Sequence, residues 1–185
     1  MRVIAGELKG KKLFSVKGMG LRPTSDRVRE AIFDILQERV RGKKVLDLFA
    51  GTGAWGIEAL SRGAEKATFV EHNAHVLAAL RRNIKECRLE KKSEVLPGDV
   101  FQGLRILASR GEVFDLIFID PPYAQGLVKQ TLKELSQRDL ITPQGLIIAE
   151  HSIKEDLSIP VPWELIDRRQ YGATNISFWQ PAGEK

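Results

Sequence analysis

The stretch Lys43-Lys-Val-Leu-Asp-Leu-Phe-Ala-Gly-Thr-Gly-Ala-Trp-Gly56 decides the fold. It begins with a short apolar run, Val45 to Phe49, that is long enough for one buried strand. The run breaks at Ala50-Gly51-Thr52-Gly53, where glycine permits positive φ and leaves room beside the backbone. Apolar residues then recur at helical spacing from Trp55 to Leu60, and Gly63 stands where such a helix would end. Strand, glycine turn and helix predict the first half of a nucleotide-binding unit, because a helix N-terminus offers unpaired N–H groups to a ligand.

The glycines alone do not show which nucleotide the turn binds. Gly51-x-Gly53-x-x-Gly56 matches the dinucleotide pattern, and Glu71 follows Gly51 by twenty positions, where a ribose-binding acid is expected. This pattern permits an NAD protein, and it also fits any α/β turn that uses glycine for tight packing. An NAD site does not explain Asp47, an acid inside the end of the strand.

Beyond the turn the chain alternates predicted strands and helices. We expect strands over residues 67–71, 94–96, 114–119 and 146–150, helices over 74–87, 101–108 and 127–135, and a closing antiparallel pair over 165–171 and 175–179. We expect residues 142–145 to form a turn before the fifth strand. Alternating β and α elements predict a doubly wound parallel sheet, which binds ligands at the carboxyl ends of its strands. Five acids fall at or near such ends: Asp47, Glu71, Asp99, Asp120 and Glu150.

The N-terminal segment predicts a short hairpin of residues 2–5 and 12–14, followed by a helix. Thr24, Ser25 or Asp26 can cap that helix. Its apolar stripe is Val28, Ile32, Ile35 and Leu36, which Arg27 and Arg29 need not enter. We therefore expect residues 1–42 to extend one compact domain of residues 43–185.

Charge divides the chain unevenly. The net charge is +5, and residues 1–43 carry eleven Lys and Arg against five Asp and Glu, whereas the remainder carries eighteen against nineteen. A basic arm on a near-neutral domain indicates a polyanionic partner, although a solvated charged surface is the alternative. The candidate phosphate-binding residues are Lys9, Lys11, Lys12, Arg22 and Arg27.

Composition excludes other classes of protein. The 185 residues fit one soluble globular domain, without an apolar run of membrane-spanning length or the apolar region of a signal peptide. The single cysteine, Cys87, excludes a disulfide framework and a cysteine zinc site. The three histidines do not indicate a metal centre. We expect a cytoplasmic monomer without a bound metal.

Asp120-Pro-Pro-Tyr123 follows the predicted fourth strand and suggests a clamp for a planar amino group. Two prolines fix φ twice and remove two backbone donors, so the turn is stiff and offers carbonyl acceptors. Asp120 and the Pro121 carbonyl could accept the two N–H bonds of an exocyclic amine while the Tyr123 ring stacks on the base. Catalysis would then depend on orientation and electrostatic complementarity rather than on a strong base. The alternative is a proline-rich loop without chemistry.

These motifs resemble a known family. Asp47-x-Phe49-x-Gly51-x-Gly53 resembles motif I of S-adenosylmethionine (SAM) methyltransferases, and Asp120-Pro-Pro-Tyr123 resembles motif IV of amino-group methyltransferases. The chain is similar almost from end to end to the RsmD-type family, bacterial methyltransferases of guanine N2 in 16S ribosomal RNA. This similarity includes Arg2-Val-Ile-Ala-Gly, Leu21-Arg-Pro-Thr-Ser-Asp-Arg-Val-Arg-Glu-Ala-Ile-Phe, Leu48-Phe-Ala-Gly-Thr-Gly, Ala59-Leu-Ser-Arg-Gly-Ala and Tyr171-Gly.

The resemblance implies a mostly parallel seven-stranded sheet with an antiparallel last strand, and it implies roles for individual residues. The implied catalytic residues are Asp120, Pro121, Pro122 and Tyr123. The implied SAM-binding residues are Asp47, Phe49, Gly51, Gly53, Glu71, His72, Asp99 and Val100. In this scheme Glu71 binds the ribose hydroxyls and Asp99 the adenine amino group. The implied partner is 16S rRNA, either free or in an assembling small-subunit particle.

Two alternatives stay open at the level of sequence. One is another amino methyltransferase, which acts on adenine N6 of DNA or RNA or on a glutamine side chain. The other is a nucleotide-binding or RNA-binding module without catalysis. Titration with SAM and with NAD separates the second alternative from an enzyme.

Overall fold

A computed structural model describes residues 1–16, 26–122, 126–157 and 162–183. Four residues to which a role was assigned above therefore lie outside the described residues: Arg22, Thr24, Ser25 and Tyr123. None of the helices within the described ranges is long and apolar enough to cross a membrane.

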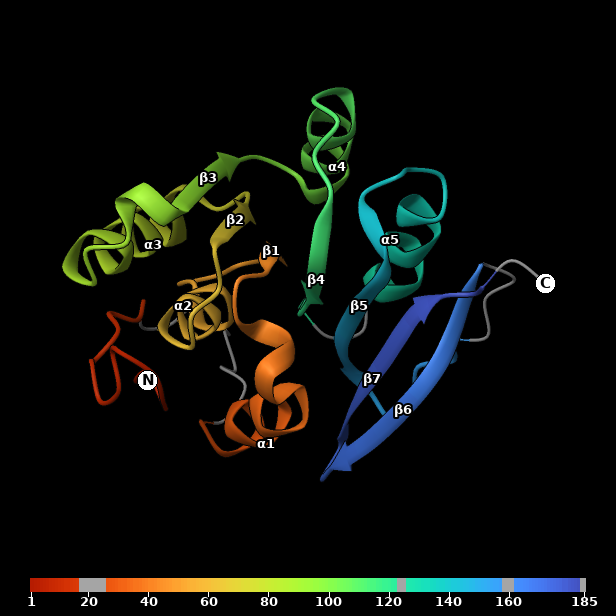
Figure 1. Ribbon diagram of the computed structural model, residues 1–185, viewed down its shortest axis with the longest axis horizontal. Coiled ribbons are helices and arrows are strands. Elements are labelled where there is room, and N and C mark those ends of the chain that lie inside the picture. The colour runs from red at the N-terminus through yellow and green to blue at the C-terminus, as the bar shows by residue number, and fades with distance from the viewer. Residues whose placement is uncertain (17–25, 123–125, 158–161, 184–185) are drawn as a thin grey trace.

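The core of the fold is a sheet of seven strands in the order β3-β2-β1-β4-β5-β7-β6. The strands are β1 (Lys44–Leu48), β2 (Lys66–Glu71), β3 (Ser93–Pro97), β4 (Phe114–Ile119), β5 (Ile141–Ser152), β6 (Trp163–Tyr171) and β7 (Thr174–Pro181). The first five pair in parallel, and β7 is antiparallel to both β5 and β6. The predicted parallel sheet with an antiparallel last strand is confirmed (Figure 1).

Helices cover both faces of the sheet. They are α1 (Asp26–Leu36), α2 (Ala54–Ser61), α3 (Ala74–Glu86), α4 (Val100–Ser109) and α5 (Leu127–Leu135), with short 3₁₀ turns η1 (Gln37–Val40) and η2 (Glu90–Lys92). One apolar core joins α1, α2 and α3 to the sheet, and a second joins α4 and α5 to its other face. Alternate residues of each central strand enter opposite cores, as the pleat requires: Phe118 faces the first core, whereas Ile117 and Ile119 face the second.

The expected turn over residues 142–145 is wrong, because β5 runs through it. Ile141 already pairs with Phe114, and the pairing resumes at Leu146 opposite Leu116 after a register shift. A turn prediction from Pro143 and Gly145 could not show that a bulge accommodates these residues inside one strand.

The N-terminal segment forms a looser hairpin than the pattern predicted. Its only strand pairing among the described residues is the isolated bridge between Arg2 and Lys12. The segment is attached to α2 instead. The fully buried Glu58 carboxylate accepts the backbone N–H groups of Ile4 at 2.7 Å and Ala5 at 3.0 Å, and the Ser61 hydroxyl accepts that of Leu8 at 3.0 Å. Polar anchors on α2 therefore hold the hairpin against the first core.

The stripe of α1 differs from the prediction at two positions. Arg29 is 1% exposed and forms an ion pair with Glu58 at 3.7 Å, whereas Ile35 is 39% exposed. Phe33 occupies the buried face in place of Ile35. The helix is thus rotated so that one arginine enters the core, where the buried Glu58 compensates its charge.

Candidate active site

The glycine turn lies at the switch point of the sheet, where β1 has β2 on one side and β4 on the other. Gly51 has a φ of 57° and Gly53 a φ of 90°, so both adopt the left-handed conformation that the sequence predicted. A Cβ atom on Gly51 would meet nothing closer than 3.9 Å. This turn is therefore open on the side of Gly51, as a ligand-binding turn must be.

Gly53 is required for a different reason. A Cβ atom there would lie 2.6 Å from Leu80 Cδ1 and 3.0 Å from Ile57 Cδ1, in a backbone conformation that side chains rarely adopt. A larger residue at this position would therefore clash with the protein itself, whether or not a cofactor is bound.

Phe49, directly before the turn, also has positive φ, at 59°. This conformation is strained for an aromatic residue and costs about 1–3 kcal/mol. Phe49 packs partly buried against the second core. Strain of this kind is concentrated at functional sites, and the position of Phe49 beside the cofactor stays a prediction.

Asp47 is completely buried near the end of β1, on the face of the sheet that α2 covers. Its Oδ2 atom accepts the Gly56 N–H at 2.9 Å, while Oδ1 has no hydrogen-bond partner. Desolvation raises the pKa of Asp47 well above its ordinary value, and the nearby Asp120 and Glu71 carboxylates raise it further, against the lowering by the Gly56 hydrogen bond. The site thus holds one buried oxygen and an excess of negative charge that a cation would satisfy.

This burial predicts the behaviour of Asp47→Asn. The amide oxygen can still accept the Gly56 N–H, and the cost of a buried charge is removed. The pKa of Asp47 is higher in the folded protein than in the unfolded chain, so the folded state binds this proton more tightly. The contribution of this carboxyl to the stability of the parent therefore falls as the pH rises above about 4, the ordinary pKa of aspartate. Denaturant unfolding at several pH values should therefore show the variant gaining stability relative to the parent as pH increases.

Asp47→Asn should at the same time lose about 10-fold or more in SAM affinity, since a hydrogen bond to a charged group contributes about 1.5–3 kcal/mol. Calorimetry measures this loss. A variant that is less stable than the parent at pH 8 and binds SAM normally would show that Asp47 only supports the fold.

Glu71 ends β2 and faces the glycine turn. Its side chain is 6% exposed, and its Oε2 atom accepts the Gly51 N–H at 2.9 Å while Oε1 accepts the Asn73 N–H at 2.8 Å. The neighbouring His72 is exposed, with Nδ1 3.3 Å from Glu71 Oε1. The carboxylate is thus oriented by two backbone donors at the open turn.

Asp99 and Val100 follow β3 on the same edge of the sheet. Asp99 is the N-cap of α4, and its Oδ1 atom accepts the N–H groups of Phe101 at 2.9 Å and Gln102 at 3.3 Å. The Val100 side chain is buried in the second core. The Gly98 N–H donates to the Glu71 carbonyl at 2.9 Å, so this loop is fixed beside the end of β2.

Asp120 follows β4 and is held by a residue whose role the sequence did not reveal. The Trp55 indole Nε1–H donates to Asp120 Oδ2 at 3.1 Å. Trp55 is 4% exposed, and its ring stacks on Phe118 with centroids 5.0 Å apart and planes 18° apart. The sequence indicated only a packing role for Trp55. Its position at the start of α2 does not show that its ring reaches the end of β4.

The structure brings three of the five predicted acids together and places the basic candidates that it describes elsewhere. Asp47, Glu71 and Asp120 lie close enough for their charges to interact. Lys9, Lys11 and Lys12 are exposed on the hairpin, and Arg27 is exposed on α1. Among the residues that the structure describes, no group of three or more His, Cys, Asp or Glu could hold a metal ion.

A seven-stranded sheet of this topology, with a glycine turn and carboxylates at its switch point, defines a SAM-dependent methyltransferase. A solved structure described as "Putative methyltransferase yhhF from Escherichia coli" has a TM-score of 0.88 and 32% identity over 100% of this chain and 99% of its own. Ribosomal RNA small subunit methyltransferase D of Escherichia coli K12 is 33% identical over 97% of this chain and 89% of its own length. The protein of the same name from Buchnera aphidicola subsp. Acyrthosiphon pisum is 35% identical over 90% of this chain and 86% of its own length.

The family described as Conserved hypothetical protein 95 matches residues 1–180. The chain belongs to this family, and the resemblance drawn from the sequence is confirmed.

Proposed function

We propose that this protein transfers a methyl group from SAM to the exocyclic N2 amino group of one guanine in 16S rRNA. The observation that carries the proposal is the position of Asp120, which stands beside the glycine turn at the switch point and is oriented by Trp55. Relatives that align with nearly the whole chain are named ribosomal RNA small subunit methyltransferases, which supports RNA as the substrate.

The residues at the carboxyl edge fit SAM. The cofactor carries positive charge on its sulfonium and amino groups, and it would meet the three neighbouring carboxylates and the unpartnered Oδ1 atom of Asp47. Glu71 would accept the ribose hydroxyls, and Asp99 and the Val100 backbone would lie against the adenine. Gly51 would let the cofactor approach the chain, and Phe49 and His72 would border it. When bound, SAM supplies an electrophilic methyl group.

The protein's part in the reaction is to orient the amine. The exocyclic nitrogen of guanine is a weak nucleophile, because its lone pair is delocalised into the ring. Asp120 and the Pro121 carbonyl would accept its two N–H bonds and favour a pyramidal nitrogen whose lone pair faces the methyl group. Pro122 fixes the turn, and Tyr123 would stack on the base. Such preorganised acceptors stabilise the developing positive charge on nitrogen without a separate strong base.

The target guanine must leave its stack to reach Asp120, so an unpaired nucleotide is the expected substrate. The extension of residues 1–42 would bind phosphates through Lys9, Lys11, Lys12, Arg22 and Arg27. We propose that the enzyme acts as a monomer without a metal.

Trp55→Phe tests the positioning of Asp120. The phenyl ring keeps the stack on Phe118, whereas the donor to Asp120 Oδ2 is lost. Because a hydrogen bond to a charged group contributes about 1.5–3 kcal/mol, kcat should fall about 10-fold or more. KM for RNA and Kd for SAM should stay within about twofold.

The matched control for Trp55→Phe is Phe33→Leu, which disturbs the same aromatic cluster without touching the hydrogen bond. It should lower the melting temperature and leave kcat nearly unchanged. If both variants reduce kcat in proportion to their loss of stability, Trp55 supports packing only.

The proposed reaction is tested with purified protein, isotope-labelled SAM and 16S rRNA, either free or in small-subunit particles. Mass spectrometry of the digested nucleosides should show label in N2-methylguanosine. Label in N6-methyladenosine, or in a glutamine of a ribosomal protein, would assign the enzyme to another amino substrate. Calorimetry that shows binding of NAD and not of SAM would overturn the class of reaction.

A further inference from the structure

We propose that a second basic cluster, formed where α3 ends, binds the phosphate backbone of the RNA substrate together with the lysines of the N-terminal hairpin. This cluster, here the α3-end cluster, consists of Lys85, Arg88, Lys91 and Lys92, all exposed. The hairpin lysines are Lys9, Lys11 and Lys12. The inference rests on the proposed function for the identity of the RNA, and it adds a surface that the reaction itself does not require.

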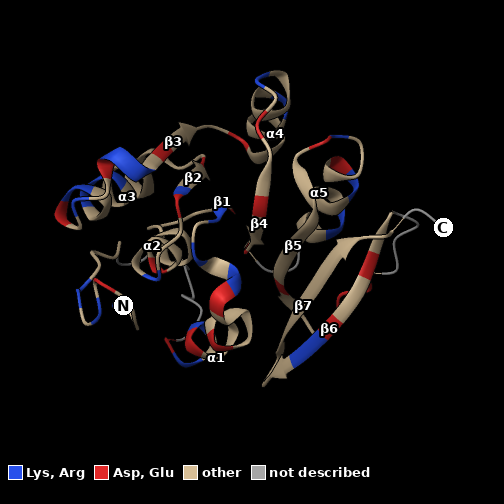
Figure 2. Cartoon of the chain, viewed as in Figure 1, with Lys and Arg blue, Asp and Glu red and all other residues tan. Residues whose placement is uncertain are grey.

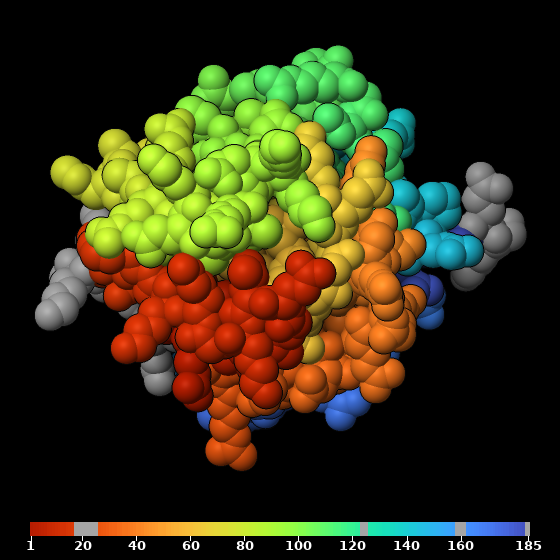
Figure 3. Space-filling view, turned by 60° about the vertical axis from the view of Figure 1, so that its left-hand side comes forward, coloured from red at the N-terminus to blue at the C-terminus, as the bar shows by residue number. Residues whose placement is uncertain are grey.

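The hairpin and the end of α3 lie side by side although they are far apart in sequence. Asn83 of α3 accepts the Phe14 N–H at 2.7 Å and donates to the Phe14 carbonyl at 3.0 Å. The Arg82 guanidinium lies 4.2 Å from the centre of the Phe14 ring. Figure 3 shows the N-terminal segment in red directly against the yellow-green atoms of α3 and the segment that follows it.

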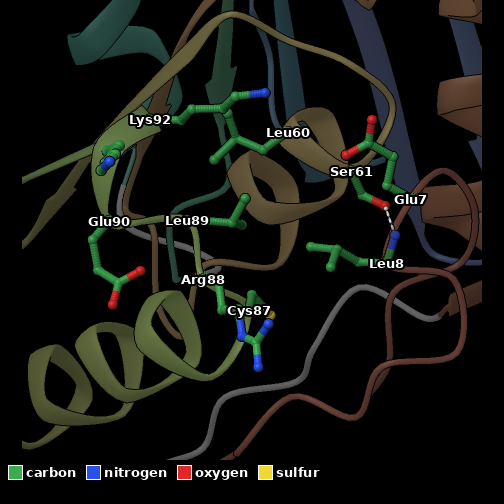
Figure 4. Close-up of a pocket in the computed structure, with 10 residues that line it drawn as sticks. Glu7, Leu8, Leu60, Ser61, Cys87, Arg88, Leu89, Glu90 and Lys92 are labelled. Atoms are coloured by element: carbon green, nitrogen blue, oxygen red, sulfur yellow. Dashed lines mark hydrogen bonds between the residues drawn. The ribbon is translucent and has the colours of Figure 1, made fainter.

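A pocket lies between the hairpin and the α3-end cluster. It encloses about 460 Å³ and is lined by Glu7 and Leu8 of the hairpin, by Leu60 and Ser61 at the end of α2, and by residues 87–92. Figure 4 shows Arg88 and Lys92 at this pocket, opposite Leu8 and Glu7. The surface is thus concave, with the cations Arg88, Lys91 and Lys92 on its α3 side and the hairpin on its other side. The hairpin lysines belong to the same segment as Leu8 but do not line the pocket. A concave basic surface follows a nucleic-acid backbone better than a flat patch would.

The charges of this surface are largely uncompensated. Among the described residues, no side-chain nitrogen of the hairpin lysines or of the α3-end cluster lies within 4.0 Å of a carboxylate oxygen. The neighbouring Arg82, in contrast, is paired, with Nε 2.7 Å from Glu86 Oε1. Elsewhere arginines such as Arg62, Arg110 and Arg138 are neutralised by ion pairs. The hairpin lysines and the α3-end cluster together supply seven cations, and the same segments contain three acids, Glu7, Glu86 and Glu90, so the local charge is positive (Figure 2).

The helix dipole explains only part of this arrangement. A cation such as Lys85 in the last turn stabilises the negative end of α3. Lys91 and Lys92 lie beyond the helix, at η2, and gain nothing from its dipole. Clustered, unpaired cations on one surface are the electrostatic signature of a phosphate-binding site.

The surface also lies away from the catalytic edge. α3 has 13 residues and so spans about 20 Å at 1.5 Å per residue, from the carboxyl edge of the sheet near Asn73 to the start of β3. RNA bound here would therefore be backbone that flanks the target guanine. Phosphate contacts of this kind position a substrate without reading its sequence.

The test compares two triple variants with the same change in charge. Lys85→Gln/Arg88→Gln/Lys91→Gln neutralises the α3-end cluster, and Lys44→Gln/Arg105→Gln/Lys133→Gln neutralises three exposed cations on other elements. Binding of a fluorescent 16S rRNA transcript is measured by anisotropy at several salt concentrations. Both variants are checked for an unchanged melting temperature and SAM affinity.

The α3-end variant should bind RNA about 10- to 100-fold more weakly near physiological salt, with a log–log salt slope shallower by about 2, since each phosphate contact contributes about 0.7 on a single strand. The control should bind like the parent. An unchanged affinity and slope in the α3-end variant, or an equal loss in both variants, would overturn the proposal. Normal binding to free RNA with weakened binding to small-subunit particles would assign the cluster to an acidic ribosomal protein instead.

The same experiment separates this inference from the proposed function. If the parent protein binds neither the transcript nor small-subunit particles, the rRNA assignment fails. If the parent binds and methylates RNA while the α3-end variant does so equally well, only the α3-end cluster is refuted.

Discussion

Asp120→Ala should bind SAM almost normally and lose about 10²- to 10³-fold in kcat, the usual cost of removing one preorganised group that stabilises developing charge. The lost carboxylate is the acceptor that orients the amine, and the substitution also leaves the buried Trp55 N–H without this partner. Single-turnover methylation of 16S rRNA measures the chemical step, and calorimetry measures the binding of SAM.

The control for Asp120→Ala is Asp115→Ala at the opposite end of the same strand. Asp115 accepts the Lys44 N–H at 3.0 Å and lies 3.4 Å from Lys43 Nζ, so its removal should cost stability. It should not slow methyl transfer, because it lies at the amino end of β4. A wild-type rate in Asp120→Ala would refute the amino-clamp mechanism.

Glu71→Ala should weaken SAM binding by about 10- to 100-fold, because charge-assisted bonds to the ribose contribute about 1.5–3 kcal/mol each. The structure adds a second consequence. The partly buried Gly51 and Asn73 N–H groups lose their acceptor, which should lower stability by about 1 kcal/mol, the usual contribution of one hydrogen bond. The variant should therefore show both a lower melting temperature and a higher Kd for SAM.

Asn73→Ala separates these two effects. It removes the N-cap of α3, whose side chain accepts the N–H groups of His75 and Val76, and should cost about 1 kcal/mol of stability. Because the Glu71 carboxylate remains, SAM affinity should stay within about twofold of the parent. Unaltered SAM affinity in Glu71→Ala would show that Glu71 serves the glycine turn and not the ribose.

Much of the fold and the candidate site could be predicted because the signals are local. A strand, its glycine turn and its helix are consecutive in sequence, and parallel strands bring their carboxyl ends to one edge. The sequence alone therefore predicts that Asp47, Glu71 and Asp120 lie at one edge of the sheet, and their charges do interact there. The β6–β7 pair around Gly172 was predictable for the same reason.

What the sequence could not show depends on contacts between distant residues. The buried pair of Arg29 and Glu58 joins two helices, and helical periodicity assigns charged residues to the surface unless the partner is known. The Trp55–Asp120 hydrogen bond spans 65 positions. The α3-end cluster could not be predicted for a related reason. The net charge of residues 44–185 is close to zero, because acids elsewhere in the chain balance the cations of this cluster.

The most direct test of the central claim is mass spectrometry of 16S rRNA nucleosides from cells that lack this gene. The proposal predicts the loss of a single N2-methylguanosine, restored by the parent gene and not by Asp120→Ala. An unchanged N2-methylguanosine content in the deletion strain would contradict it.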